Sequence, residues 1–210
     1  MQLFLYILGG LILIFVISQI IGKLATIPCP AWLAWIVNQD NPFFKNYQTA
    51  SILNCLALQE GMQVLDFGCG AGRLTIPLAK AVGKQGKVTA ADIQTAMLAK
   101  VQAKAKREQV DNIEYVHTAA GEGKLAKNTY DRALLVTVLG EVPDKLALLR
   151  EIYDSLKPQG WLCLTEVIAD PHFQWQKGVI KLAEQAGFNE RARFGNGLSY
   201  TLLFEKAELG

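Results

Sequence analysis

Three glycines at alternate positions follow an aspartate in the middle of the chain, namely Gly68, Gly70 and Gly72 after Asp66. A short apolar run precedes the aspartate, and the residues from Arg73 onward are typical of the start of a helix. Glycine allows positive φ and lets a ligand approach the main chain, and the first turn of a helix presents free N–H groups. The stretch therefore predicts a strand, a turn and a helix that bind a flat, polar ligand.

The glycine spacing separates two classes of nucleotide-like ligand. The dinucleotide fingerprint G-x-G-x-x-G needs a glycine where Arg73 stands, and no phosphate-binding G-x-x-x-x-G-K-[ST] sequence is present. The stretch Asp-x-Gly-x-Gly-x-Gly instead resembles the first motif of the class I S-adenosylmethionine (SAM) methyltransferases. This resemblance covers the chain from about residue 48 to its C-terminus and implies SAM as the cofactor.

A second acid, Asp92, ends the next predicted strand, 24 residues after Gly68. A carboxylate at this place can accept hydrogen bonds from both hydroxyls of a ribose. The resemblance implies that Asp92 holds the ribose of SAM, that Ile93 lies against the adenine, and that Asp66 contacts the amino end of the methionine part. The alternatives are that Asp92 complements a helix dipole and that Asp66 only braces its loop.

The segment after the third predicted strand departs from the family pattern. Many relatives place an acid there to hold the adenine amino group, whereas this chain has Ala119 and Ala120. Their backbone groups, or Glu122 reaching back, are the candidates for that contact. The residues for which the resemblance implies cofactor contact are Asp66, Gly68, Cys69, Gly70, Gly72, Asp92, Ile93, Ala119, Ala120 and Val138.

The acceptor class is indicated by the segments after the fourth and fifth predicted strands. An Asn/Asp-Pro-Pro-Tyr/Phe motif would imply methylation of an amide or exocyclic amine, and it is absent, so the chain resembles the small-molecule, lipid and quinone methyltransferases. Glu141 is placed to face the transferred methyl group, or else lies on a loop surface. Asp170 and His172 can take up a proton from the acceptor, or else belong to a solvated loop. These three are the predicted catalytic residues.

Cysteine spacing and net charge give no sign of a metal site or a nucleic-acid partner. The four cysteines are scattered without C-x-x-C pairs or nearby histidines, so neither a zinc site nor a disulfide framework is expected. Lys and Arg number 21 against 19 Asp and Glu, which leaves no basic field for nucleic acid.

Strands and helices alternate along most of the chain. The apolar patterns predict strands at 64–66, 87–92, 113–117, 132–138 and 162–168, and helices at 48–58, 74–82, 95–108, 144–156 and 175–186. Two further strands, 191–194 and 198–204, form a hairpin around a Gly-Asn-Gly turn. We therefore expect an α/β fold, a doubly wound, mostly parallel seven-stranded sheet that ends in an antiparallel hairpin, with ligands at the carboxyl ends of its strands.

The N-terminal segment is uncharged from residue 3 to residue 22, and as a helix it is about 30 Å long. We expect a transmembrane anchor over residues 1–23, because a cleaved signal peptide needs a basic n-region that is missing here. Lys23 follows the span and favours a cytoplasmic location for the rest of the chain. A SAM-dependent domain also needs the cytosol.

The next segment, residues 24–47, is rich in proline and aromatic residues. We expect either a short helix at the headgroup level of a membrane or a flap packed on the domain at 48–210, and either one would cover the cofactor cleft. The residues that suggest this segment are Pro28, Pro30, Trp32, Trp35, Phe43 and Phe44.

Together these features predict a single-pass, membrane-anchored SAM-dependent methyltransferase with a small acceptor that partitions into membranes, such as a lipid, quinone or isoprenoid. Alignment of donor and acceptor alone accelerates methyl transfer, so the lack of an obvious base does not argue against catalysis. One alternative is a protein methyltransferase acting on a membrane partner, and another is a non-catalytic, methyltransferase-like binding subunit.

Overall fold

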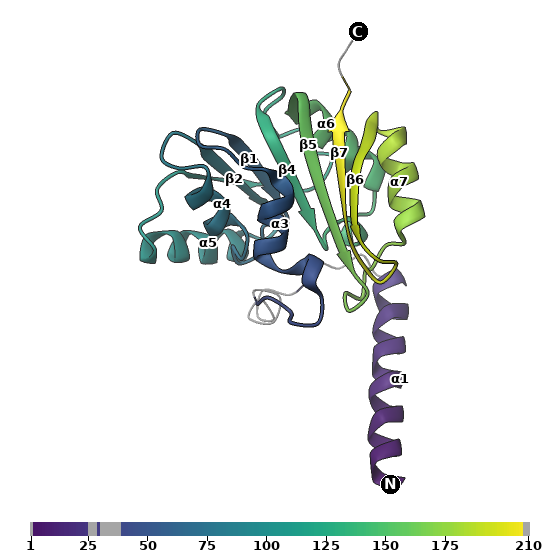
Figure 1. Ribbon diagram of the computed structural model, residues 1–210. Helices are drawn as coiled ribbons and strands as arrows, with labels where there is room; N and C mark the ends of the chain where they lie inside the picture. The colour runs from purple at the N-terminus through teal and green to yellow at the C-terminus, as the bar shows by residue number, and fades with distance from the viewer. Residues whose placement is uncertain (1, 25–28, 30–38, 208–210) are drawn as a thin grey trace.

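A seven-stranded sheet forms the centre of the protein (Figure 1). The computed structural model describes residues 2–24, 29 and 39–207. The strand order is β3-β2-β1-β4-β5-β7-β6, in which neighbours among β1 to β5 run parallel and β7 runs antiparallel to both β5 and β6. The predicted sheet and its terminal hairpin are therefore confirmed. The strands are β1 Gln63–Phe67, β2 Lys87–Asp92, β3 Ile113–His117, β4 Tyr130–Val136, β5 Leu156–Val167, β6 Phe188–Gly195 and β7 Ser199–Lys206.

Helices cover both faces of this sheet. Alternate residues of a strand point to opposite faces, and in β1 the side chain of Val64 packs with α3 and α4 while that of Leu65 packs with α6 and α7. Helix α5 packs through Val101 and Leu98 on Ala90 of β2, on the α4 side. The helices are α3 Thr49–Leu56, α4 Thr75–Ala81, α5 Thr95–Arg107, α6 Lys145–Ser155 and α7 Gln176–Gln185, with 3₁₀ turns η2 Lys45–Tyr47 and η3 Leu139–Glu141.

Strand β4 ends two residues earlier than predicted. Its last residue is Val136, because Thr137 adopts φ +55° and turns the chain out of the sheet. A positive φ is costly for a β-branched residue, and such strain is typical of functional sites. The turn places Val138 against the glycine turn that follows β1.

Strand β5 begins earlier than predicted. Leu156 pairs with Tyr130, and after an irregularity the pairing resumes between Trp161 and Arg132. Residues 157–160 bulge out between these two pairs, with Gln159 at φ +62°. The sequence Pro158-Gln159-Gly160 thus bends the strand at this point.

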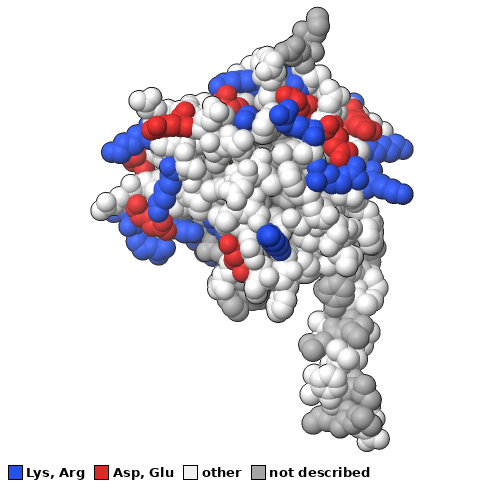
Figure 2. Space-filling model, in the orientation of Figure 1, with Lys and Arg blue, Asp and Glu red and all other residues white. Residues whose placement is uncertain are grey.

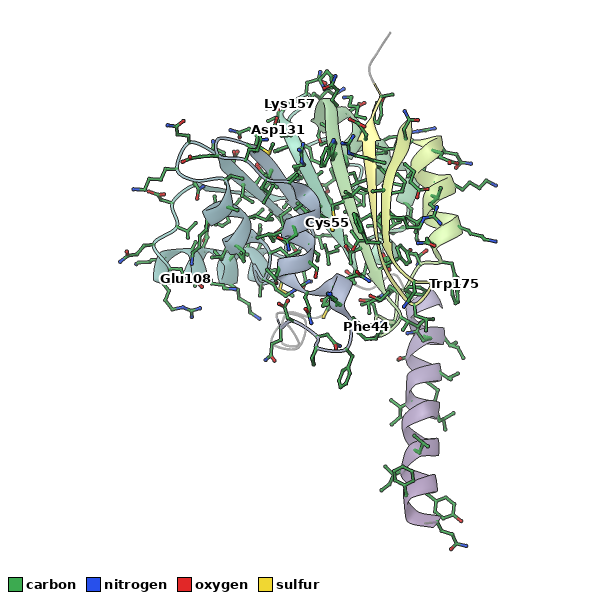
Figure 3. All side chains as sticks on the ribbon, in the orientation of Figure 1. Phe44, Cys55, Glu108, Asp131, Lys157 and Trp175 are labelled. Atoms are coloured by element: carbon green, nitrogen blue, oxygen red, sulfur yellow. The ribbon has the colours of Figure 1, made fainter. Side chains whose placement is uncertain are left out.

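The amino ends of the central strands lie at the end of the sheet opposite α1. There the backbone N–H of Gln63, at the start of β1, donates to Asp131 Oδ2 at 2.8 Å, and Asp131 pairs with Lys157 at 2.8 Å. Figure 3 shows Asp131 and Lys157 together at that end, and Phe44 and Trp175 near the end from which α1 projects. The carboxyl ends of the parallel strands therefore face the α1 side.

Helix α1, Gln2–Leu24, confirms the predicted N-terminal helix and projects away from the domain (Figure 1). Its C-terminal end is fixed to the loop after β5, because Gln19 Nε2 donates to the carbonyl oxygens of Ile168 and Asp170, both at 3.0 Å. In the part of the chain that the structure describes, no helix has both the length and the apolar character that a membrane crossing requires. The predicted membrane anchor is thus not supported by this structure.

Part of the predicted flap lies outside the described residues. This concerns Pro28, Pro30, Trp32 and Trp35. Phe43 is described, and its side chain is 88% exposed.

Candidate functional site

A cavity of about 400 Å³ lies at the carboxyl ends of the parallel strands. Its wall combines the turn after β1, the ends of β2 and β4, the loops after β3 and β5, and parts of the N-terminal segment. Among the predicted site residues, Gly72 and His172 lie outside its lining. The predicted residues that line it are Asp66, Gly68, Cys69, Gly70, Asp92, Ile93, Ala119, Ala120, Val138, Glu141 and Asp170.

The glycine turn leaves its backbone open to the cavity at one position. Gly68, Gly70 and Gly72 all have positive φ, at +73°, +52° and +80°. A Cβ at Gly68 would collide with Val138, and a Cβ at Gly72 would lie 3.2 Å from Val101 of α5. A Cβ at Gly70 would meet no described atom within 4 Å, so Gly70 is the place where a ligand can approach the main chain.

Asp92 fixes this turn from the neighbouring strand. Its Oδ2 accepts from the N–H of Gly70 at 2.9 Å, and its Oδ1 accepts from the N–H of Gln94 at 2.8 Å. Burial raises the pKa of Asp92, and these two backbone N–H groups oppose the rise. Each carboxylate oxygen has about two acceptor sites, so Asp92 can brace the turn and still accept from a ligand hydroxyl.

Asp66 is buried at the end of β1, with a side chain that lines the same cavity. Burial raises its pKa to about 6, while the hydroxyl of Thr75, which donates to Asp66 Oδ2 at 2.6 Å, and the charge of Arg73 oppose the rise. Asp66 therefore remains mainly ionised at neutral pH. A carboxylate at this place suits a cationic group of a ligand.

The loop after β3 offers the cavity two alanines, Ala119 and Ala120. Glu122 does reach back, but its Oε2 accepts from the N–H of Ala119 at 3.2 Å and from the hydroxyl of Thr118 at 3.3 Å. It also pairs with Lys124 at 2.7 Å. The carboxylate thus braces the loop and occupies the N–H of Ala119, whose carbonyl oxygen accepts from Thr118 Oγ1 at 3.0 Å. The apolar surface of the two alanines is what they offer to a ligand.

Two further acids line the cavity. Glu141 lies in η3 after β4, and Asp170 lies in the loop after β5. Burial raises the pKa of Glu141 to about 8; the charge of Asp170 adds to the rise, and a backbone hydrogen bond from Cys29 opposes it. Glu141 is therefore mainly protonated at neutral pH, as a carboxylic acid in a poorly solvated place.

His172 stands beside Asp170 and outside the cavity lining. Its backbone N–H donates to Asp170 Oδ1 at 2.7 Å, and its Nδ1 lies 3.7 Å from the same oxygen. The predicted histidine thus braces Asp170 and does not itself face the cavity. Glu166, near the end of β5 and before this loop, is 1% exposed. Its Oε2 accepts from the N–H of Gln174 at 3.2 Å, and no described group pairs with its Oε1.

The cavity has further walls that the motifs did not indicate. Tyr47 and Arg73 line it from the N-terminal segment and from the residue after the glycine turn. Cys29 lines it as well, and its carbonyl oxygen accepts from Gln94 Nε2 at 2.9 Å. Thr137, with its positive φ, completes this set. Tertiary packing brings these residues together. Of the four, only Arg73 was part of a motif comparison, because the dinucleotide fingerprint needs a glycine at its position.

The residues present fit a nucleoside with a charged amino acid tail. The cavity volume falls in the range of roughly 300–1,000 Å³ that is usual for small-molecule sites. Asp92 keeps free acceptor sites for ribose hydroxyls, Gly70 is open toward the cavity, and Asp66 supplies a carboxylate. No group of three metal-ligating side chains occurs among the described residues.

Comparison with known proteins agrees with this geometry. Residues 43–188 match the family model described as the ubiE/COQ5 methyltransferase family. A demethylmenaquinone methyltransferase of Listeria welshimeri is 34% identical over 128 residues, which cover 61% of this chain and 54% of that protein. One from Staphylococcus aureus is 36% identical over 115 residues, 55% of this chain and 47% of that protein. The chain thus spans about half the length of the curated relatives it matches.

Solved structures share the fold. A SAM-dependent methyltransferase from Aquifex aeolicus superposes with a TM-score of 0.76 at 23% identity, over 85% of this chain and all of that one. A phosphoethanolamine N-methyltransferase from Haemonchus contortus, in complex with phosphomonomethylethanolamine and S-adenosylhomocysteine, gives 0.65 at 22% identity, over 77% and 42%. Because the family model matches more than half of its residues, this chain belongs to the ubiE/COQ5 methyltransferase family, a family of SAM-dependent methyltransferases.

Proposed function

We propose that this chain is an active SAM-dependent methyltransferase and that its acceptor is a small quinone-type ring. The observation that carries the proposal is one cavity whose lining includes the glycine turn and Asp92 together with Glu141 and Asp170. The demethylmenaquinone methyltransferases among its relatives support the quinone class. The apolar residues that line the cavity beside these acids suit an aromatic acceptor.

The cofactor roles follow from the geometry of the first three strand ends. Asp92 binds the ribose hydroxyls while it holds Gly70 in place. Asp66 binds the amino end of the methionine part. Ile93, which is 49% exposed beside the cavity, and the two alanines after β3 enclose the adenine by apolar contact. Adenine recognition by shape compensates for the missing acid after β3.

The chain contributes mainly alignment to the reaction. Bound SAM supplies an electrophilic methyl group on a sulfonium. The glycine turn and the end of β4, where Val138 packs against Gly68, both line the cavity and would hold SAM and the acceptor beside each other. Well-oriented reacting pairs reach effective molarities on the order of 10⁵–10⁸ M, so positioning supplies much of the acceleration.

The proton that the acceptor loses goes to Glu141. Methyl transfer from bound SAM would break the bond between the methyl group and sulfur and form a bond to carbon or oxygen of the acceptor, which would release one proton. Glu141 lies in the cavity and takes this proton when it is ionised, and its pKa near 8 is close to the working pH that suits a general base. Asp170 beside it is positioned by His172.

The proposal is tested with the purified full chain, SAM carrying a labelled methyl group, and a demethylmenaquinone analogue offered in its reduced and its oxidised form. Label should appear in the reduced analogue, because the hydroquinone ring is the nucleophile. The rate should rise with pH up to about 8, and Glu141→Gln should remove this rise. SAM binding by calorimetry without any methyl transfer would instead identify a non-catalytic binding subunit.

We further propose that the chain works at a membrane, with its domain on the cytoplasmic side where SAM is made. Support comes from the exposed apolar side chains of α1, and on the face that Figure 2 shows, the described part of that helix carries no charged residue. These side chains are Phe4, Tyr6, Ile7, Leu8, Leu13, Ile14, Val16, Ile17 and Ile20. The full chain should float with phosphatidylglycerol and phosphatidylethanolamine vesicles, and a chain without residues 1–24 should not. Equal flotation of the full chain and of the chain without residues 1–24 would overturn the proposed location at a membrane.

A further inference from the structure

Arg73 makes an unusually complete set of contacts for a residue next to a glycine turn. Its side chain is only 10% exposed. Its Nη1 donates to Asp40 Oδ1 at 2.9 Å, to the carbonyl oxygen of Tyr47 at 2.9 Å and to Thr49 Oγ1 at 3.3 Å. Its guanidinium carbon lies 4.1 Å from the centre of the Tyr47 ring. One guanidinium thus binds four groups of a segment that precedes it by more than twenty residues.

The segment that Arg73 holds is internally fixed at the same point. Asp40 Oδ1 also accepts from the N–H and the hydroxyl of Thr49, at 2.9 and 2.8 Å. This closes a loop over residues 40–49, which we call the clasp segment. On its other side Asn46 bonds to β7, where its Nδ2 donates to the carbonyl oxygen of Ser199 at 3.3 Å.

Tyr47 is the residue of the clasp segment that reaches the cavity. Its side chain is buried and lines the cavity together with Arg73 and Asp66. A hydrogen bond links its side chain to that of Thr137, the strained residue at the end of β4. The ring therefore lies between Arg73, whose charge acts on Asp66, and Thr137 at the β4 end.

We propose that Arg73 is a positioning residue for the cofactor: it docks the clasp segment on the glycine turn, so that Tyr47 forms the wall beside the methionine part of SAM. The inference rests on the proposed function for the identity of the ligand. It adds an arginine, a tyrosine and a segment outside the glycine motif to the cofactor site. It also explains why an arginine stands where a dinucleotide-binding protein has its third glycine.

A second consequence concerns charge. Asp66 is buried, with Thr75 and Arg73 opposing the rise of its pKa and Asp92 adding to it, and Cys69 is the remaining titratable neighbour in the turn. Loss of the Arg73 charge should therefore raise the pKa of Asp66 further above about 6. The ammonium group of SAM needs the ionised carboxylate of Asp66. As the pH is lowered, the variant should therefore lose SAM binding at a higher pH than the native chain does.

The first experiment compares Arg73→Met with Arg132→Met. Arg132 is a matched control, because it is buried, donates to the carbonyl oxygen of Leu56 at 2.7 Å and stacks over Trp161 at 3.8 Å, but does not line the cavity. Arg73→Met should weaken SAM binding in calorimetry by about tenfold or more, whereas Arg132→Met should lower the melting temperature and leave SAM affinity unchanged. Equal losses of affinity in both variants would overturn the proposal.

Two further variants keep the test decisive if Arg73→Met unfolds. Asp40→Ala removes the partner carboxylate, which lies outside the cavity lining, and should raise the KM for SAM with little change in kcat. Arg73→Lys keeps the charge but loses the planar guanidinium that lies over the Tyr47 ring, so it should weaken binding while the pH at which binding is lost stays native. Unchanged SAM affinity in both variants would refute the proposal, and a native chain that fails to bind SAM would refute the proposed function instead.

Discussion

Two carboxyl groups in one cavity have different protonation states. Burial raises the pKa of both, but Asp66 reaches only about 6 because the Thr75 hydroxyl and Arg73 favour its ionised form. Glu141 reaches about 8 because Asp170 adds a like charge. At neutral pH the chain therefore offers an anion at Asp66 and a neutral acid at Glu141. This division of charge suits a cationic donor and a neutral ring.

Glu141→Gln should stabilise the chain in a pH-dependent way. The pKa of Glu141 in the folded chain lies above its unfolded value near 4.5, so its ionisation opposes folding. Its favourable contribution is complete below pH 4.5 and is lost as pH rises toward 8, by at most about 1.4 kcal/mol per pH unit. Thermal unfolding from pH 5 to 8 should show a growing advantage of Glu141→Gln over the native chain. The exposed Glu184→Gln is the control, and a constant offset would contradict the prediction.

Asp92→Asn should lose SAM affinity by a factor of about 10 to 100, because a carboxylate that accepts from hydroxyl groups contributes roughly 1.5–3 kcal/mol. The amide oxygen still accepts from one of the two backbone N–H groups that hold the turn, so the fold should persist. Calorimetry measures the loss. Asp131→Asn, at the opposite end of the sheet, should lower the melting temperature and leave SAM affinity unchanged.

The individual residues of the site divide into those that a sequence can indicate and those that it cannot. Asp66 and Asp92 were predicted to lie together because each ends a strand of a parallel sheet, and the structure brings both to the cavity. Tyr47 and Thr137 give no such signal. One enters the cavity from a segment outside the domain pattern, and the other is marked only by a backbone angle.

At the scale of elements, two glycines of the turn after β1 have different roles. Gly68 is required for packing, and Gly70 is required for access of the ligand. Gly68→Ala must both adopt a positive φ and push Val138 aside, whereas Gly70→Ala meets only the cost of the left-handed conformation, about 1–2 kcal/mol. We expect Gly68→Ala to be the less stable variant in urea unfolding. Gly70→Ala should stay folded and lose SAM affinity, because its methyl group points into the cavity. If Gly70→Ala were instead the less stable variant, the Val138 side chain would have to move away from the new methyl group at little cost in free energy.

Element boundaries were predictable where apolar patterns ended in ordinary turns. Strands β2 and β3 have the predicted limits, Lys87–Asp92 and Ile113–His117. The ends of β4 and β5 were displaced by Thr137 and by the bulge at 157–160, and both deviations depend on neighbouring strands. Local sequence carries no information about such pairing.

At the scale of the whole molecule, α1 is tied to the acceptor end of the site. The two hydrogen bonds from Gln19 hold the loop that carries Asp170. Gln19→Ala removes both, at about 0.5–1.5 kcal/mol each, and should loosen that loop without touching the cofactor end. We expect a higher KM for the acceptor and an unchanged dissociation constant for SAM. Parallel changes in both constants would show that α1 supports the whole domain.

The strand order β3-β2-β1-β4-β5-β7-β6 also divides the chain at its middle. Strands β1 to β3 supply Asp66, Gly70, Asp92 and the two alanines, and the ends of β4 and β5 supply Val138, Glu141 and Asp170. Under the proposed function, the first part of the chain therefore holds the cofactor and the later part the acceptor, with Val138 of the later part also contacting the cofactor. Exchange of the segment from β4 onward between homologues should therefore change the molecule that is methylated. The nucleoside contacts that follow β1, β2 and β3 would stay the same.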